Sequence, residues 1–262
     1  MTSPKATPVT HRPPIAPPLS DLAEALALLT RLPVPGFVPR GARSAWAWPL
    51  AGAIVGTLAG GAGALALWAG MPAGVAAAVA VATAALATGG LHEDGLADSF
   101  DGLFGGRTPA ARLAIMRDSR LGSFGALALV LAVLIRWTAL AALAAAGPGS
   151  LLAGAVAAAA LSRAPMAAVS CALPNARGGG LSHATGRPAA RTAVLAALAA
   201  LVLALALWGL PALWLALAAT LPALWLAAQA RRRIGGQTGD VLGGCQVLAE
   251  CATLAVAAAI LG

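Results

Sequence analysis

The sequence predicts an all-α protein: a polytopic membrane helical bundle. Of its 262 residues, 60% are hydrophobic and only 10% carry a charge, whereas soluble proteins average roughly 45–50% and about 25%. Too few charged side chains remain to cover a soluble surface. No polar linker interrupts residues 19–262, so we expect a single integral membrane catalytic domain there. Residues 1–18 are rich in proline, threonine and serine and are expected to form a disordered tail.

Seven apolar segments approach the roughly 20 residues that a helix needs to cross a bilayer. A shorter helix, capped by Ser20 and ending before Pro33, should be an interfacial or a re-entrant helix. Gly52, Gly56 and Gly60 form a stripe along the first span. The stripe either admits a closely packed neighbour or reflects only the general abundance of glycine and alanine. The expected spans cover about 46–69, 73–91, 124–146, 151–172, 191–209, 211–229 and 241–261.

The placement of lysine and arginine predicts the orientation. These residues gather in the segments 1–45, 92–123, 173–190 and 230–240, while the turns at 70–72, 147–150 and 210 contain none. Positive residues accumulate on the cytoplasmic side of membranes. We therefore expect a multi-pass protein of the cytoplasmic (inner) membrane with its amino terminus and charged loops inside. The net charge of +8 then reflects topology, and no nucleic-acid partner is expected.

Charged residues also occur within the predicted spans. Arg136, Arg163 and Glu250 lie in apolar segments, where a central charge costs at least about 2.5–3.5 kcal/mol. They are therefore expected to face the interior of the bundle. Two roles remain open: Glu250 pairs with one of the arginines, or these side chains bind substrate phosphates.

The segment 88–125 holds five of the nine carboxylates. On a helix, Asp94, Asp98 and Asp101 share one face, because they are spaced i, i+4 and i+7. Bare carboxylates this close repel one another, and a divalent cation relieves the repulsion. Oxygen ligands without a cysteine pattern favour Mg²⁺. The alternative is a solvated acidic loop.

An Arg-Asp-Ser-Arg sequence follows this acidic cluster. Arg117 and Arg120 flank Asp118, and guanidinium groups bind phosphate through charge-assisted, often bidentate hydrogen bonds. The alternative role for arginines here is to anchor the protein at the inner face. The chain has no Walker sequence and no nucleophile arrangement of serine, cysteine and histidine. These features together indicate metal-assisted phosphoryl transfer on a phosphorylated substrate.

Two more polar clusters lie on the same predicted side of the membrane. Residues 175–183 form a glycine-rich segment that we expect to be a connector, with a substrate loop as the alternative. Before the last span come Gln237, Thr238 and Asp240. Either Asp240 simply caps the last helix, or all three residues complete the site.

With these motifs in place, the sequence resembles the cobalamin synthase family, the adenosylcobinamide-GDP ribazoletransferases. The resemblance implies a membrane-embedded, Mg²⁺-dependent enzyme. In its reaction, a ribose hydroxyl of α-ribazole or its 5′-phosphate attacks the phosphate beside the cobinamide arm of adenosylcobinamide-GDP. Adenosylcobalamin or its 5′-phosphate forms, and GMP leaves. The motifs that carry the resemblance are TRLPVP (30–35), WPLAGAIVG (48–56), GGLHEDGLADSFDG (89–102), IMRDSRLGSFG (115–125), LSR (161–163) and GGQTGDVLG (235–243).

The resemblance also assigns roles to individual residues. Asp94, Asp98 and Asp101 would be the catalytic metal ligands, and Asp118 would be a further ligand or the base that accepts the ribose proton. The implied substrate-binding residues are His92, Arg117, Arg120, Ser123, Arg163, Gln237, Thr238 and Asp240.

Rival functions use the same residues. A CDP-alcohol phosphotransferase starts with a similar Asp-Gly pair, but its pattern departs at Asp98. From another class, a polytopic transporter would line a path with Arg136, Arg163 and Glu250. The expected partners are the two substrates and the lipid bilayer, with a homo-oligomer or other enzymes of cobalamin synthesis as further candidates.

Overall fold

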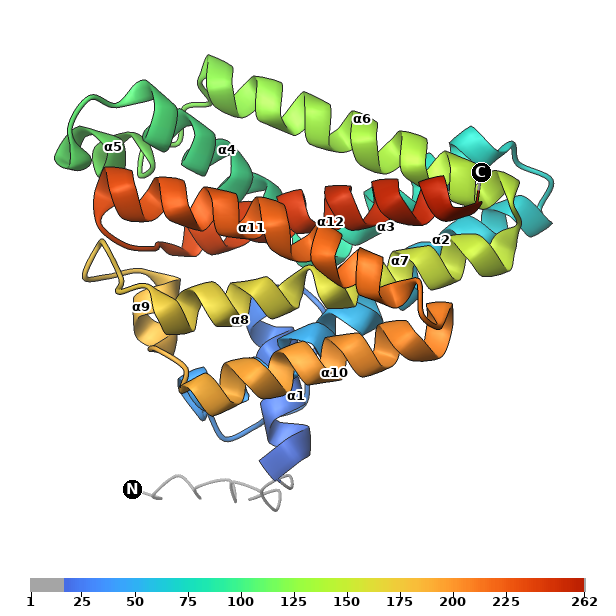
Figure 1. Ribbon diagram of the computed structural model, residues 1–262, viewed down its shortest axis with the longest axis horizontal. Coiled ribbons are helices and arrows are strands. Elements are labelled where there is room, and N and C mark those ends of the chain that lie inside the picture. The colour runs from blue at the N-terminus through green and yellow to red at the C-terminus, as the bar shows by residue number, and fades with distance from the viewer. Residues whose placement is uncertain (1–16, 262) are drawn as a thin grey trace, which may run out of the picture.

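A computed structural model describes residues 17–261, which form helices joined by short loops and contain no β-strand (Figure 1). One of these helices, η1, is a 3-10 helix, and the others are α-helices. In chain order they are α1 (Pro17–Leu29), η1 (Gly41–Ala47), α2 (Trp48–Trp68), α3 (Ala73–Thr88), α4 (Leu91–Gly105), α5 (Pro109–Ile115), α6 (Ser123–Ala145), α7 (Pro148–Leu161), α8 (Arg163–Ala172), α9 (Leu181–Thr185), α10 (Ala190–Trp208), α11 (Ala212–Ile234) and α12 (Gly239–Leu261).

Six helical segments within residues 17–261 are long and apolar enough to cross a membrane, which confirms the predicted multi-pass bundle. The predicted span at 73–91 differs from the others. Helices α3 and α4 satisfy the same test only together, and they meet at 87°. Gly89 and Gly90 make this bend, since both adopt positive φ angles that L-residues rarely adopt. The six spans are Gly41–Trp68, Ser123–Ala145, Pro148–Ala172, Ala190–Trp208, Ala212–Ile234 and Gly239–Leu261.

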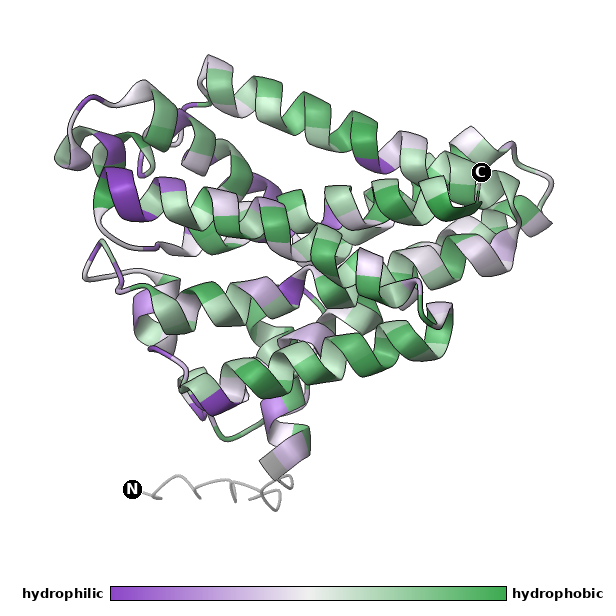
Figure 2. Ribbon diagram, viewed as in Figure 1, coloured by the Kyte–Doolittle hydropathy of each residue, from purple (hydrophilic) through white to green (hydrophobic). Residues whose placement is uncertain are grey.

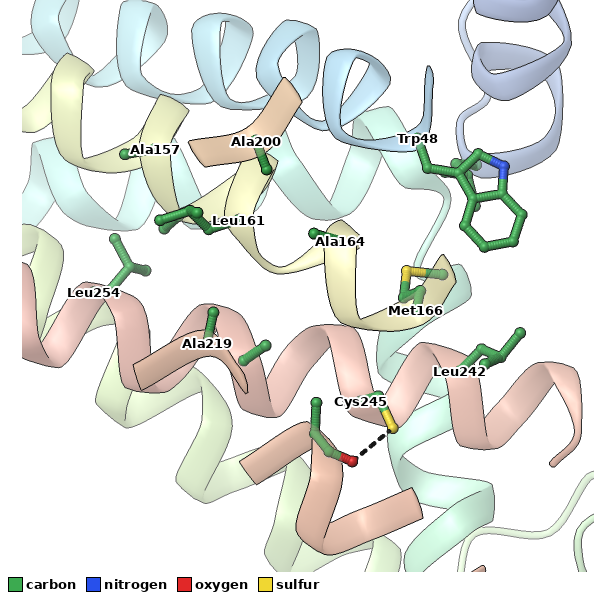
Figure 3. Packing of buried hydrophobic residues seen from close by; sticks show 14 of the residues in the cluster. Trp48, Ala157, Leu161, Ala164, Met166, Ala200, Ala219, Leu242, Cys245 and Leu254 are labelled. Carbon is green, nitrogen blue, oxygen red and sulfur yellow. Dashed lines mark hydrogen bonds between the residues drawn. The ribbon is translucent and has the colours of Figure 1, made fainter. Parts of the chain in front are cut away.

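The glycine stripe of α2 packs directly against α7. A β-carbon added at Gly56 would lie 2.6 Å from the carbonyl oxygen of Ala155, and one at Gly60 would lie 2.9 Å from the Cα atom of Leu152. The close-packing alternative is therefore confirmed. Within a bilayer the hydrophobic effect does not drive helices together, because lipid tails are as apolar as the helix surface. Small residues stabilise the pair instead, since they allow close van der Waals contact. Figure 3 shows the resulting core, in which alanine and leucine side chains of α7, α10, α11 and α12 interlock.

The short first helix differs from its prediction. It begins at Pro17, so Ser20 lies inside the helix and is not its cap. Pro17 and Pro18 can occupy the first turn, because the backbone N–H that proline lacks would have no partner within the helix there. The Ser20 hydroxyl instead accepts a hydrogen bond from the Val38 N–H at 3.0 Å. Apart from these two prolines, the predicted tail at 1–18 lies outside the described residues.

The two ends of the bundle differ in polarity. Helices α5 and α9 and the α11–α12 connection lie at one end, and the α2–α3, α6–α7 and α10–α11 connections lie at the other, with the carboxyl terminus (Figure 1). Hydrophilic residues gather at the first end, which we call the polar end (Figure 2). The structure thus brings the predicted charged segments 92–123, 173–190 and 230–240 to one end.

Candidate functional site

Helix α4 presents Asp94 and Asp98 on successive turns at the polar end. Asp94 is exposed and Asp98 is partly buried. Both line a pocket of about 650 Å³, which we call the outer pocket. The spacing of four residues places both carboxylates on the same side of the helix, as the sequence predicts.

The last helix supplies a third carboxylate. A β-carbon at Gly95 would lie 2.8 Å from the carbonyl oxygen of Asp240, so the backbones of α4 and α12 touch at this point. Gly95 permits this approach because it carries no side chain. The negative charges of Asp240 and Asp94 both act on Asp98. The structure therefore groups Asp94, Asp98 and Asp240, although Asp240 lies 142 positions beyond Asp98 in the chain.

Asp101 has a different environment. It is buried, and its two carboxylate oxygens accept hydrogen bonds from the N–H groups of Gly122 and Gly125, each at 2.8 Å. These donors belong to the first turn of α6, whose amino-terminal N–H groups have no partner within the helix. Asp101 caps α6 and ties the loop at 106–122 to α4. The structure does not bring it into the outer pocket with Asp94 and Asp98.

The arginine-rich loop also contributes side chains to the outer pocket. Arg117, Asp118 and Arg120 all line it. Arg120 holds Asp118 through two nitrogens, with Nη2 at 2.6 Å and Nε at 3.0 Å from Oδ2. These hydrogen bonds lower the pKa of Asp118, which makes it a weak proton acceptor. Arg31 also lines the pocket, and sequence reasoning missed it because its only signal was its place in the TRLPVP motif.

The loop at 173–189 packs onto the site, so its expected role as a simple connector is corrected. Arg177 places Nη2 at 2.6 Å from Oδ2 of Asp240. The backbone of Gln237 exchanges two hydrogen bonds of 2.8 Å with residues 174–176. Ser182 donates a hydrogen bond of 2.8 Å to the side-chain oxygen of Gln237. Gln237 therefore holds the loop in place, and Arg177 is a site residue that the sequence did not single out.

Thr238, and not Asp240, caps the last helix. The Thr238 hydroxyl accepts a hydrogen bond from the N–H of Val241 at 3.2 Å and donates one to Asp240 at 3.3 Å. Thr238 is 1% exposed. Its side chain therefore fixes the start of α12 and the position of Asp240.

A second pocket, of about 130 Å³, shares Asp94 with the outer pocket, and we call it the inner pocket. Asp94 lines both pockets. His92, Arg177 and Asp240 also line the inner pocket. His92 is 2% exposed, and its Nε2 atom has no hydrogen-bond partner among residues 17–261. The site thus consists of two compartments with one carboxylate in their common wall.

Arg136, Glu93 and Glu250 form an ion-pair network that reaches the outer pocket, since Glu93 also lines that pocket. Arg136 places Nη1 at 2.7 Å from Oε1 of Glu93 and at 3.9 Å from Oε2 of Glu250. Arg163 donates a hydrogen bond to the carbonyl oxygen of Ala159 at 2.8 Å and is 2% exposed. The pairing of Glu250 with an arginine is confirmed, although Glu93 is the closer partner. Arg163 and the predicted substrate residue Ser123 line neither pocket.

The carboxylate pair on α4 fits a magnesium ion. Within the described part of the chain, no group of three or more histidine, cysteine, aspartate or glutamate side chains is arranged to hold a metal. Mg²⁺ does not require such a cage, because it commonly takes one or two protein carboxylates, several waters and oxygens of a substrate phosphate. Asp94 and Asp98 face a pocket large enough for all of these. The oxygens of Asp101 are already occupied by backbone N–H groups.

Comparison with known proteins identifies the family. The chain is 44% identical to an adenosylcobinamide-GDP ribazoletransferase of Bradyrhizobium diazoefficiens over 246 residues, which cover 92% of this chain and 94% of the relative. It is 45% identical to the protein of that name from Azorhizobium caulinodans, over 90% of this chain and 94% of the relative. No solved structure matches. Residues 21–258 match the family model described as cobalamin-5-phosphate synthase, and the chain therefore belongs to the cobalamin-5-phosphate synthase family.

Proposed function

We propose that this protein is a Mg²⁺-dependent adenosylcobinamide-GDP ribazoletransferase. It joins adenosylcobinamide-GDP to α-ribazole, or to the 5′-phosphate of α-ribazole, and releases GMP. The observation that carries this proposal is the position of Asp94 in the common wall of two pockets. A transferase with two substrates needs two adjoining compartments, because holding the reactants together accounts for much of the rate enhancement.

The outer pocket is suited to the diphosphate. Arg31, Arg117 and Arg120 line one part of it, and Asp94 and Asp98 line another. The arginines would bind the phosphate oxygens, and Asp118 would orient Arg120 through their paired hydrogen bonds. Mg²⁺ held by Asp94 and Asp98 would neutralise charge on the diphosphate and on the departing GMP.

In the proposed reaction, the acceptor hydroxyl approaches from the inner pocket. The ribose oxygen forms a bond to the phosphorus atom beside the cobinamide arm. The bond from that phosphorus to the bridging oxygen breaks, and GMP leaves with the electron pair. The hydroxyl proton passes to Asp240, which lines the inner pocket and lies beside Asp98. Asp240 suits this role better than Asp118, because Asp118 lines the outer pocket and not the inner one.

The test uses purified protein in lipid nanodiscs with both substrates. GMP and the corrinoid product should appear together, only when α-ribazole and Mg²⁺ are both present. Asp94→Asn and Asp98→Asn should abolish turnover or raise the Mg²⁺ concentration that it requires. Arg232→Gln, at an exposed residue of the polar end, is the control that should leave turnover unchanged. Full activity and unchanged Mg²⁺ dependence in both aspartate variants would disprove the metal assignment.

We also propose that the polar end faces the cytoplasm of a cell whose inner membrane holds the protein. Support comes from the hydrophilic residues gathered at that end (Figure 2) and from the arginines in the α4–α6 and α8–α10 connections and in the last turn of α11. A cysteine introduced at Leu121 should react with a membrane-impermeant maleimide only in inside-out vesicles. A cysteine at Leu210, at the opposite end, should react in intact cells. Both positions are exposed, at 59% and 77%. The reverse labelling pattern would overturn the orientation.

A further inference from the structure

The inner pocket has an apolar part away from its carboxylates. Leu29 of α1, Trp48 of α2, Met166 of α8 and Leu242 of α12 contribute to its lining. Figure 3 shows Trp48, Met166 and Leu242 converging from three different helices. All four side chains are at most 5% exposed. These walls suit a small, flat, mostly apolar group, and a volume of about 130 Å³ is far too small for a corrin ring.

Two buried polar atoms of this pocket lack a partner. The indole N–H of Trp48 and the Nε2 atom of His92 make no hydrogen bond to any residue of 17–261. Trp48 is 3% exposed and His92 is 2% exposed. A buried polar group without a partner is unfavourable, and such groups in native proteins commonly mark a ligand or a bound water. The indole nitrogen can only donate, so its missing partner is an acceptor.

We infer that the inner pocket binds the aromatic base of the acceptor nucleoside. This inference rests on the proposed function, since ribazole is a riboside of a benzimidazole. The benzimidazole ring is flat and apolar, and it carries one ring nitrogen with a free lone pair and no donor. Trp48 would donate its N–H to that lone pair, and Leu29, Met166 and Leu242 would cover the ring faces.

The alternative occupant is the guanine of the other substrate. Guanine carries several donors and acceptors along its edge, and each buried one would need a partner. Around Trp48 the lining includes the apolar side chains of Leu29, Met166 and Leu242, and the polar side chains of the pocket besides His92 are Asp94, Ser170, Arg177, Ser182, Thr185 and Asp240. Among the apolar side chains guanine would lose hydrogen bonds, whereas a benzimidazole needs only one donor for its ring nitrogen. This difference favours the benzimidazole on the apolar side of the pocket.

This placement also orients the ribose. Asp94 and Asp240 line the same pocket as Trp48, and Asp94 extends into the outer pocket. With its base against Trp48, the nucleoside would direct its ribose toward these two carboxylates. The attacking hydroxyl would then lie at the wall between acceptor and diphosphate.

The test compares Trp48→Phe with Trp137→Phe. The Trp48 variant keeps an aromatic wall but loses the N–H. Trp137 is a matched control because its N–H donates to the Gly74 carbonyl at 2.8 Å near the opposite end of the bundle. In Trp48→Phe, the KM for α-ribazole should rise on the order of tenfold, the effect of one hydrogen bond. The KM for adenosylcobinamide-GDP should stay within about twofold of wild type, because the outer pocket keeps its hydrogen bonds. Trp137→Phe should change neither KM.

A second variant fills the pocket. Ser170→Met adds bulk at a buried lining residue and should weaken binding of α-ribazole in equilibrium dialysis, with folding checked by thermal unfolding. An increase in the KM for adenosylcobinamide-GDP alone, or unchanged α-ribazole binding in both pocket variants, would overturn the inference. Failure of the proposed function is a separate result: wild-type protein would then release no GMP with both substrates present. The dialysis measurement would still test the pocket.

Discussion

Arg177 and Asp240 form an ion pair that fastens the loop at 173–189 to the first turn of the last helix, with Nη2 of Arg177 at 2.6 Å from Oδ2 of Asp240. The two side chains are only 14% and 20% exposed, so solvent screens the pair weakly. Because Asp94 and Asp98 lie close by, this arginine is a cation held within a group of three carboxylates. The pair therefore holds the loop against the site and also reduces the net negative charge of the site.

Arg177→Gln should lower kcat/KM by about 10- to 100-fold, as expected for loss of a largely buried ion pair. The substitution frees the loop and removes the positive charge that faces Asp240. If the two residues act as a unit, the double variant Arg177→Gln/Asp240→Asn should lose much less kcat/KM than the product of the fold losses in the two single variants. Steady-state GMP release measures all three variants, with Arg232→Gln as the control. If the fold loss in the double variant equalled the product of the two single losses, the two residues would act independently.

Asp101→Asn should affect stability and not metal dependence. An asparagine places an NH₂ group against one of the two glycine N–H donors, which costs roughly 1–3 kcal/mol when that donor stays buried. The melting temperature in detergent should fall, while the Mg²⁺ concentration that supports half-maximal GMP release should stay the same. Asp94→Asn should raise the Mg²⁺ concentration needed for half-maximal GMP release and leave the melting temperature unchanged. A changed Mg²⁺ requirement in Asp101→Asn would return Asp101 to the metal site.

The fold could be predicted because hydropathy and charge placement act locally along the chain. The spans and the polar end follow from which residues prefer lipid and which prefer water. The bend between α3 and α4 was missed because Gly89 and Gly90 occur within an apolar run, and only their backbone angles show that the chain turns.

The site was predictable in part for a similar reason. Spacing of four residues places Asp94 and Asp98 together on any helix. The same spacing rule includes Asp101, but its partners, Gly122 and Gly125, return from 21 and 24 residues further along the chain. The contact of Arg177 with Asp240 likewise spans 63 residues. Such long-range contacts depend on how the helices pack, and local sequence patterns do not contain that information.

Gly95→Ala should reduce activity because it separates the helices that assemble the site. The added methyl group would meet the backbone of Asp240 at 2.8 Å, so α12 would have to move away from α4. Gly105→Ala, at the end of the same helix, is a matched control, since its nearest contact would be at 3.9 Å. GMP release should fall at least about tenfold in Gly95→Ala, because displacements of about 1 Å can cost a hundredfold. Equal activity in the two variants would show that the helix contact is not required.

Arg136→Met should destabilise the protein by about 3 kcal/mol, because it leaves the partly buried carboxylate of Glu93 without its partner. The double variant Glu93→Leu/Arg136→Met should recover most of that loss, since Glu250 keeps a hydrogen bond of 2.9 Å from Gln246. Thermal and denaturant unfolding in detergent measures both. Glu93 precedes the proposed metal ligand Asp94, so GMP release in the double variant tests whether the ion pair also positions α4. Recovered stability with low turnover in the double variant would show that the ion pair positions α4. A loss of stability below about 1 kcal/mol in Arg136→Met would instead show that the pair is hydrated and behaves like an ion pair at a protein surface.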